Sequence, residues 1–321
     1  MLQVRLETPG SFALRDTAPP EVGPGQALVR VRRIGVCGTD LHAFAGRQPF
    51  FQYPRVLGHE LGVEVIDAPE GAGVNVGDRC AVEPYSSCGT CHSCRRGKPN
   101  CCEKLQVLGV HTDGGMGELL AVPVEKLFPS KALALDQLAL VETLGIGQHA
   151  VERAAVQLGE AVLVVGAGPI GSAVVQFARA AGAQVTVLEP NPVRRAFVER
   201  FGATATTDVG TELFEVVFDA TGNAAAMNRS FEFVAFGGKL VFVGLMQGQV
   251  TFDDPLFHRR EMTILASRNS AGAFPAIIAA IEAGRIDTAP WITHRMTLRD
   301  VPERFADLPK QPGLVKAMID V

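Results

Sequence analysis

The sequence lacks the features that mark membrane proteins, secreted proteins and nucleic-acid-binding proteins. No uninterrupted apolar stretch in the 321 residues approaches about 18, the length that a membrane-spanning helix needs. Residues 1–10 include Arg5 and Glu7 and have no apolar run like that of a signal peptide. Lys and Arg form no long cluster and the net charge is −4, which argues against nucleic acid as a partner. These absences favour a cytoplasmic protein that acts on a small molecule.

Cysteines are few but strongly clustered. Five of the seven lie between Cys88 and Cys102. The chain is 47% hydrophobic and 20% charged, which is typical of a globular protein with a large core. Disulfides are rare in a reducing cytosol, where clustered cysteines more often bind metal. The cluster therefore indicates a zinc site.

The pattern of apolar residues changes along the chain and predicts two kinds of structure. The first 130 residues contain short apolar runs broken by Gly and Pro, which indicate a mostly antiparallel β domain. A helical pattern follows over 135–157, and after it strands alternate with helices, as a parallel, doubly wound sheet requires. The strands expected in that sheet are 161–165, 184–188, 216–218, 239–243 and 262–266.

These patterns predict an α/β protein with two domains. A β-rich domain is expected over 1–144, a doubly wound parallel-sheet domain over 145–266, and a return to the first domain over 267–321. The return segment contains one more predicted helix, at 274–283.

A dinucleotide site is predicted at the first strand of the parallel sheet. Gly166-x-Gly168-x-x-Gly171 follows that strand directly and precedes a helical run, which places a pyrophosphate at a helix N-terminus. The next strand ends at Glu189, whose carboxylate can accept hydrogen bonds from the adenosine ribose. Since this carboxylate repels a 2′-phosphate, NAD is favoured over NADP. Arg194 either flanks the adenine or binds a phosphate.

A structural zinc site is predicted in a lobe over 88–102. Cys88, Cys91, Cys94 and Cys102 supply four thiolates within 15 residues, and Cys101 competes with Cys102 as the fourth ligand. Tight turns bring such paired spacings around one tetrahedral ion. With all four positions filled by protein, this ion binds no substrate.

Three polar clusters elsewhere are candidates for the chemistry. They are the segment 37–42, the pair His59-Glu60, and Glu142 within an apolar run. A lone Cys is usually a small core residue, and a His-Glu pair is usually a solvated strand edge. Glu142 is harder to explain in that way, because a carboxylate among apolar residues risks burial without a partner. A metal ion resolves this, since Cys, His and Glu are suitable zinc ligands.

Taken together, the motifs resemble those of the zinc-containing medium-chain dehydrogenase/reductase (alcohol dehydrogenase) family. The resemblance covers the whole chain, is strongest to the sorbitol- and threonine-dehydrogenase-like branch, and is nearest to bacterial sugar-acid dehydrogenases of the galactonate or gulonate type. The motifs that carry it are Cys37-Gly-Thr-Asp-Leu-His42, Gly58-His59-Glu60, the four-cysteine lobe, Asp113-Gly-Gly, Glu142, Gly166-x-Gly-x-x-Gly171 and Asp219-Ala-Thr-Gly222.

The resemblance implies a GroES-like catalytic domain, a Rossmann domain, and a catalytic zinc in addition to the structural one. Cys37 and His59 would hold the catalytic zinc, with Glu60 and Glu142 as further ligands, and which carboxylate or water completes the shell stays open. Thr39 would hydrogen-bond the substrate hydroxyl and His42 would carry its proton outward, with Glu60 also counted among the catalytic residues.

The resemblance also implies NAD as the hydride acceptor and assembly into a homo-oligomer, a dimer or a tetramer. Besides Glu189 and Arg194, the cofactor-binding residues would be Gly166, Gly168, Pro169, Ile170, Gly171, Thr221, Gly222, Val243 and Gly244.

The substrate is the least determined part of this interpretation. Arg268 aligns with a substrate-binding arginine of the sorbitol dehydrogenase branch, and it either binds a hydroxyl, holds Glu142, or pairs with a substrate carboxylate. That branch has an aromatic hydroxyl immediately after the His42 position, where this chain has Ala43, which weakens a polyol assignment. The stretches His258-Arg-Arg-Glu261 and Ser267-Arg-Asn-Ser270 resemble those of bacterial sugar-acid dehydrogenases that act on hexonates, so a hexonate-like sugar acid is the leading expectation. The alternatives are a polyol, threonine or a simple alcohol, and a non-enzymatic nucleotide-binding scaffold is a remote possibility.

Overall fold

The computed structural model describes residues 1–48 and 51–321, and the chain forms two compact units. The first unit comprises Met1–Glu142, Phe274–Glu282 and Thr288–Val321, and the second comprises Thr143–Ala273 and Ala283–Asp287. Among the described residues, no helix combines the length and the apolar character needed to cross a lipid bilayer.

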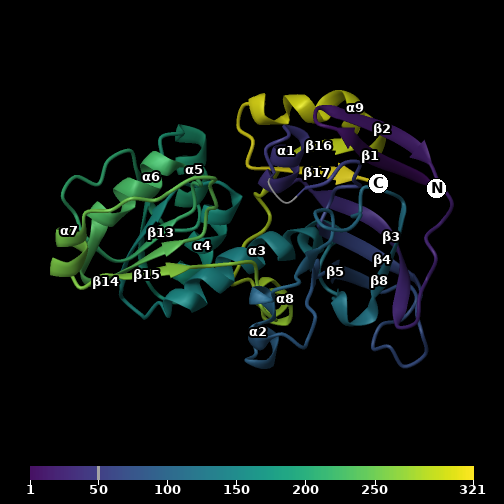
Figure 1. The fold of residues 1–321 in the computed structure, drawn as a ribbon, viewed down its shortest axis with the longest axis horizontal. Coiled ribbons are helices and arrows are strands. Elements are labelled where there is room, and N and C mark those ends of the chain that lie inside the picture. Colours follow the sequence, from purple (N-terminus) through teal and green to yellow (C-terminus); the bar gives the residue numbers. More distant parts are fainter. Residues whose placement is uncertain (49–50) are drawn as a thin grey trace. The chain divides into compact units, whose positions relative to one another are not determined.

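The first unit is built on a seven-stranded sheet centred on β3 (Gln26–Gly35). One edge of β3 pairs with β4 (Glu60–Asp67), and the other edge is shared by β8 (Leu119–Pro123) and β17 (Lys316–Asp320). The sheet is completed by β5 (Arg79–Val82), β9 (Leu127–Pro129) and β16 (Ile292–Thr297). The last strand of the chain thus lies beside the first long strand, next to the segment that contains Cys37 (Figure 1).

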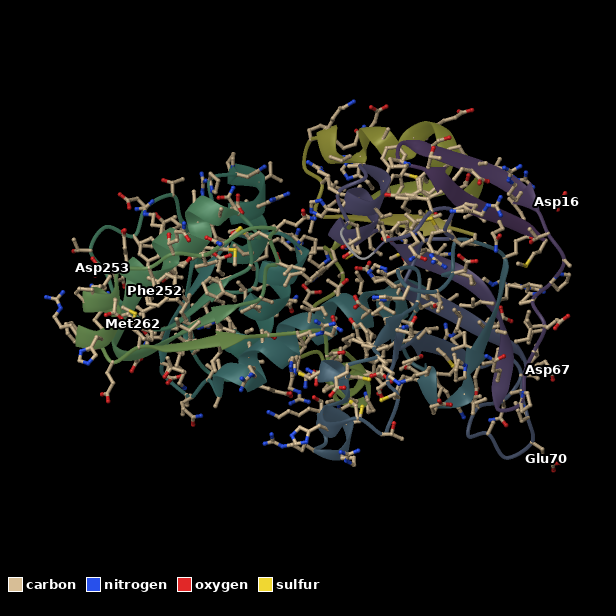
Figure 2. The ribbon with its side chains drawn as sticks, viewed as in Figure 1. Asp16, Asp67, Glu70, Phe252, Asp253 and Met262 are labelled. Atoms are coloured by element: carbon tan, nitrogen blue, oxygen red, sulfur yellow. The ribbon has the colours of Figure 1, made fainter. Side chains whose placement is uncertain are left out.

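Alternation along β3 explains how this sheet forms a core. Ala27, Val29 and Val31 are fully buried, whereas the intervening Arg30 and Arg32 lie on the other face. Asp67 ends β4, and the loop after it carries the exposed Glu70 to the periphery of the unit (Figure 2).

Short elements complete the first unit. A hairpin of β1 (Leu2–Thr8) and β2 (Ser11–Asp16) lies outside the main sheet, as does the pair β6 (Tyr85–Ser86) and β7 (Gln106–Val107). Its helices are α1 (Gly38–Phe44), α2 (His92–Arg95), α8 (Phe274–Glu282) and α9 (Val301–Arg304), with 3-10 turns η1 (Pro99–Cys101), η2 (Val124–Lys126), η4 (Leu298–Asp300) and η5 (Phe305–Lys310).

The second unit contains a six-stranded sheet in which every pairing is parallel. Counted along the chain the strand order is 3-2-1-4-5-6, that of a Rossmann fold. The strands are β10 (Ala161–Val165), β11 (Gln184–Leu188), β12 (Thr204–Thr206), β13 (Phe214–Asp219), β14 (Val234–Phe242) and β15 (Thr263–Ala266). The helices are α4 (Pro169–Ala180), α5 (Pro192–Glu199), α6 (Ala224–Arg229) and α7 (Asp254–Arg259), with the 3-10 turn η3 (Ser230–Phe233).

The α/β architecture expected from the sequence is confirmed, and the element ends differ in ways that have local causes. The helix expected to reach residue 157 is α3 (Leu135–Ala154), which ends where Ala155 takes a positive φ of 52°. The helix expected after the glycine motif begins inside it, at Pro169, because proline is favoured in a first turn. β14 begins at Val234, five residues before the expected strand.

Candidate functional site

Four thiols converge in the lobe between β6 and β7. The sulfur atoms of Cys88, Cys91, Cys94 and Cys102 all lie within 4.8 Å of one another, whereas the exposed Cys101 is outside this group. Backbone hydrogen bonds from the Thr90–Cys91 turn stabilise the thiolate of Cys88 and lower the pKa of that thiol to about 6. Four thiolates so arranged fit a structural zinc ion, which leaves no position for a substrate.

A second group joins Cys37, His59 and Glu60, whose ligand atoms also lie within 4.8 Å of one another. The pairing of β3 with β4 creates it, because Gly35 faces Glu60 across the two strands. A Cβ atom on Gly35 would lie 2.1 Å from Glu60 Oε2, so glycine leaves room there for the carboxylate. Cys37 then caps the N-terminus of α1, beside the residue that precedes β4.

Asp40 is hydrogen-bonded to one member of this group and lies close to a second. Its Oδ2 accepts a hydrogen bond of 2.9 Å from the Cys37 amide, and its Oδ1 lies 3.7 Å from His59 Nδ1. Burial raises the pKa of Asp40. Burial alone would lower the pKa of His59, but the negative charges of Asp40 and Cys37 raise it well above its usual value.

The donor atoms of this second group fit a catalytic zinc ion. Asp40 Oδ1 and His59 Nδ1 are buried without a hydrogen-bond partner among the described residues, as expected for a site that a cation completes. Thiolate, imidazole and carboxylate are zinc ligands, and three of them leave the fourth tetrahedral position open.

Sequence reasoning missed the cation that faces Glu60. Lys316, on β17, places its Nζ 2.5 Å from the Glu60 carboxylate, and both side chains are buried. Burial acts to lower the pKa of Lys316, but the charges of Glu60 and Cys37 raise it overall. A lysine within the otherwise apolar run 314–319 is the signal that points to it.

Glu142 also has a partner that the sequence did not reveal. It lies on α3 and is 5% exposed, and its Oε1 accepts a hydrogen bond from the hydroxyl of Tyr85. Burial raises the pKa of Glu142, with the charge of Glu60 adding to the effect and that of His59 opposing it. Glu142 lies outside the three-residue group, so its place as a zinc ligand stays a prediction.

Thr39 and His42 lie on α1, three residues apart and therefore on neighbouring positions of the helix surface. Thr39 is half-buried and His42 is exposed. α1 thus connects the Cys37 end of the metal group with a residue in contact with solvent.

The predicted dinucleotide residues gather at the carboxyl ends of β10 and β13. Gly166 has a φ of +91°, and a Cβ atom on Gly171 would lie 1.9 Å from the Gly166 carbonyl oxygen. Gly168 has open space around it and caps α4 without a side chain, followed by Pro169 and Ile170 in the first turn. The free amides of that turn suit a pyrophosphate.

The loops after β13 and β14 are joined by one buried residue, Asp219, through its carboxylate and its backbone carbonyl. Asp219 Oδ1 accepts hydrogen bonds from the amide and hydroxyl of Thr221, next to Gly222, and its carbonyl accepts 2.9 Å bonds from the amides of Val243 and Gly244. The predicted cofactor residues of these two loops are therefore brought together.

Glu189 follows β11 and is buried, with both oxygens aimed at the adjoining loops. Oε2 accepts a 2.8 Å hydrogen bond from the Ala167 amide and Oε1 accepts one of 2.8 Å from the Asn191 amide. Arg194 is half-buried on α5. Arg268 is exposed in the segment after β15 of the second unit, and its role towards the metal group of the first unit stays a prediction.

Two family models match the chain. Residues 23–132 match the alcohol dehydrogenase GroES-like domain, and residues 169–283 match the zinc-binding dehydrogenase model.

Similarity to individual proteins extends from end to end. The chain is 40% identical to L-galactonate-5-dehydrogenase of Escherichia coli K12, over 98% of this chain and 97% of that protein. A protein of Sinorhizobium meliloti 1021, assigned as a zinc-binding dehydrogenase and solved with NADP, is 30% identical, with a TM-score of 0.94 over 100% of this chain and 99% of that one. A protein of Escherichia coli CFT073 named as a short chain alcohol dehydrogenase, solved with NADH, is 27% identical with a TM-score of 0.94 over the same shares. Zinc and a nicotinamide dinucleotide are thus the cofactors that the site and its relatives share.

Proposed function

Since this chain belongs to the zinc-binding dehydrogenase family with an alcohol dehydrogenase GroES-like domain, we propose that it oxidises a secondary alcohol of a sugar acid with NAD. The observation that carries the substrate class is the 40% identity to L-galactonate-5-dehydrogenase over nearly the full length of both chains. We assign catalysis to the first unit and dinucleotide binding to the second.

The residues of the first unit have separate tasks in this reaction. A bound zinc ion supplies Lewis-acid polarisation of a hydroxyl, which lowers the pKa of that hydroxyl. Cys37, His59 and Glu60 would hold the ion. Glu142, which lies outside that group, would be a further ligand, directly or through water. Asp40 lies beside His59, with 3.7 Å between Oδ1 and Nδ1, and would help to orient the imidazole in the way that carboxylates support metal-bound histidines.

Proton transfer is assigned to α1. Thr39 accepts the hydrogen bond of the substrate hydroxyl, and His42, which is exposed, releases the proton to water. NAD supplies the hydride acceptor.

The second unit favours NAD over NADP. The N-terminus of α4 binds the pyrophosphate, and Glu189 accepts hydrogen bonds from the adenosine ribose. Each Glu189 oxygen accepts a hydrogen bond from a backbone amide, and a carboxylate oxygen has a second lone pair for a ribose hydroxyl. A 2′-phosphate would meet a buried negative charge at that place.

Arg268 is proposed as the residue that recognises the substrate carboxylate, since a guanidinium pairs with a carboxylate through two parallel hydrogen bonds. The test is NADH formation with hexonates and hexitols at equal concentration. We expect hexonates to turn over faster, and Arg268→Ala to raise KM for the hexonate while leaving KM for the hexitol within about twofold. Faster turnover of hexitols would identify a polyol dehydrogenase instead.

We also propose a homo-oligomer, a dimer or a tetramer, in the cytoplasm. Among the described residues, β15 ends its sheet and pairs with β14 alone, so its outer edge is open for a second copy of the chain. Ile264 on β15 is partly exposed, as is Phe252, which is labelled in Figure 2. Light scattering on the purified protein measures the subunit number. The four-cysteine lobe has the arrangement of a metal site, and clustered cysteines that bind metal are typical of a reducing compartment.

A further inference from the structure

Tyr85 lies on β6, at the base of the hairpin that ends in the four-cysteine lobe. Tyr85 pairs with Val107 across β6 and β7, and the Leu108 amide donates a 2.9 Å hydrogen bond to the Pro84 carbonyl. In the segment that connects the two strands, the Cys88 amide donates a 3.3 Å hydrogen bond to Cys102 Sγ. A two-residue pair of strands is marginal alone, so the closed lobe keeps the strands paired and holds Tyr85 in place.

The side chain of Tyr85 lies close to the catalytic group, since its ionisable neighbours include Glu142 and Cys37. It is 7% exposed, and its hydroxyl donates to Oε1 of Glu142, a carboxylate that burial otherwise disfavours. The ionisable neighbours of Glu142 include His59 and Glu60 of the metal group. The phenol is thus hydrogen-bonded to a carboxylate that interacts electrostatically with these two residues.

We propose that Tyr85 is a positioning residue of the catalytic centre: its hydroxyl fixes the Glu142 carboxylate beside the Cys37–His59–Glu60 group. This inference rests on the proposed zinc site but not on the substrate. Without the hydroxyl, the Glu142 side chain can change its rotamer. The metal site would then lack a carboxylate held in one orientation. The four-cysteine lobe thereby contributes to the catalytic centre through the strand at its base.

The experiment uses Tyr85→Phe, which keeps the ring and removes the hydroxyl. The holoenzyme is prepared with Co2+ at the catalytic site and zinc in the lobe, because the visible spectrum of Co2+ reports its ligand geometry. We expect a changed spectrum, and release of the catalytic metal to a chelator faster by roughly tenfold to a hundredfold. The lobe metal should leave at the wild-type rate.

Tyr53→Phe is the matched control, because Tyr53 is the other tyrosine of the chain and its hydroxyl donates to the Ala43 carbonyl. Its spectrum and metal release should match the wild type. In a Glu142→Gln background, Tyr85→Phe should add no further change in metal release, since the phenol acts through that carboxylate.

An unchanged cobalt spectrum and unchanged metal release in Tyr85→Phe would overturn the proposal, as would full additivity with Glu142→Gln. Neither measurement involves a substrate. If the metal measurements agree with the proposal but the enzyme does not oxidise hexonates, the proposed substrate is wrong and the role of Tyr85 stands.

Discussion

Lys316 and Glu60 form an ion pair in which both side chains are 1% exposed, although 256 residues separate them in the sequence. Removing one partner of such a pair leaves the other charge buried and uncompensated. Lys316→Met should therefore lower the free energy of unfolding of the metal-free protein by about 3–5 kcal/mol in urea titrations.

The control for this prediction is Lys310→Met, which breaks an exposed pair with Asp307. It should cost about 0–1 kcal/mol, because solvent screens such pairs. Equal effects of the two substitutions would contradict the buried pairing.

Cys37→Ala should abolish activity and reduce zinc from about two to about one per chain, since it removes one of three protein ligands from an open site. NAD affinity, measured by fluorescence titration, should be retained because the dinucleotide residues lie in the second unit. Cys101→Ala should keep both ions and activity, as Cys101 is outside both metal groups. Normal turnover by Cys37→Ala would refute the site.

Glu189→Ser should shift cofactor preference towards NADP. The substitution removes the carboxylate that would repel a 2′-phosphate, so the ratio of kcat/KM for NADP over NAD should rise by roughly tenfold or more, equivalent to about 1.4 kcal/mol. Glu199→Ser, at the exposed end of α5, is the control with an unchanged ratio. An unchanged ratio of kcat/KM in Glu189→Ser would contradict the proposal that Glu189 binds the adenosine ribose.

The stability of the protein should depend on pH through His149 on α3. Burial lowers the pKa of His149, so the folded protein favours the neutral ring more than the unfolded chain does. The contribution of His149 to the free energy of unfolding is fully present above the pKa of about 6.5 that its side chain has in the unfolded chain. It is lost as pH falls through the lower pKa of the folded protein. Between pH 7 and 5, Tm should thus fall less steeply for His149→Gln than for the wild type, while His258→Gln, at an exposed position, should follow the wild type.

Local patterns predicted the parts of the fold that depend on neighbours in sequence. β10 and β11 begin and end at the residues expected from their apolar runs, since β10 is almost wholly buried and β11 buries Val185 and Val187. β14 was longer than expected because its first half contains Gly237 and Gly238, which interrupt the apolar pattern.

The sequence alone determined the family, the glycine turn before α4 and the four-cysteine lobe, because each of these motifs lies within a short segment. Tertiary structure decided which partners the buried carboxylates have. Lys316 reaches Glu60 only because β17 and β4 flank the same strand, and Tyr85 reaches Glu142 only because a hairpin base packs against α3. Contacts between such distant segments follow from strand pairing and core packing, which local residue patterns do not encode.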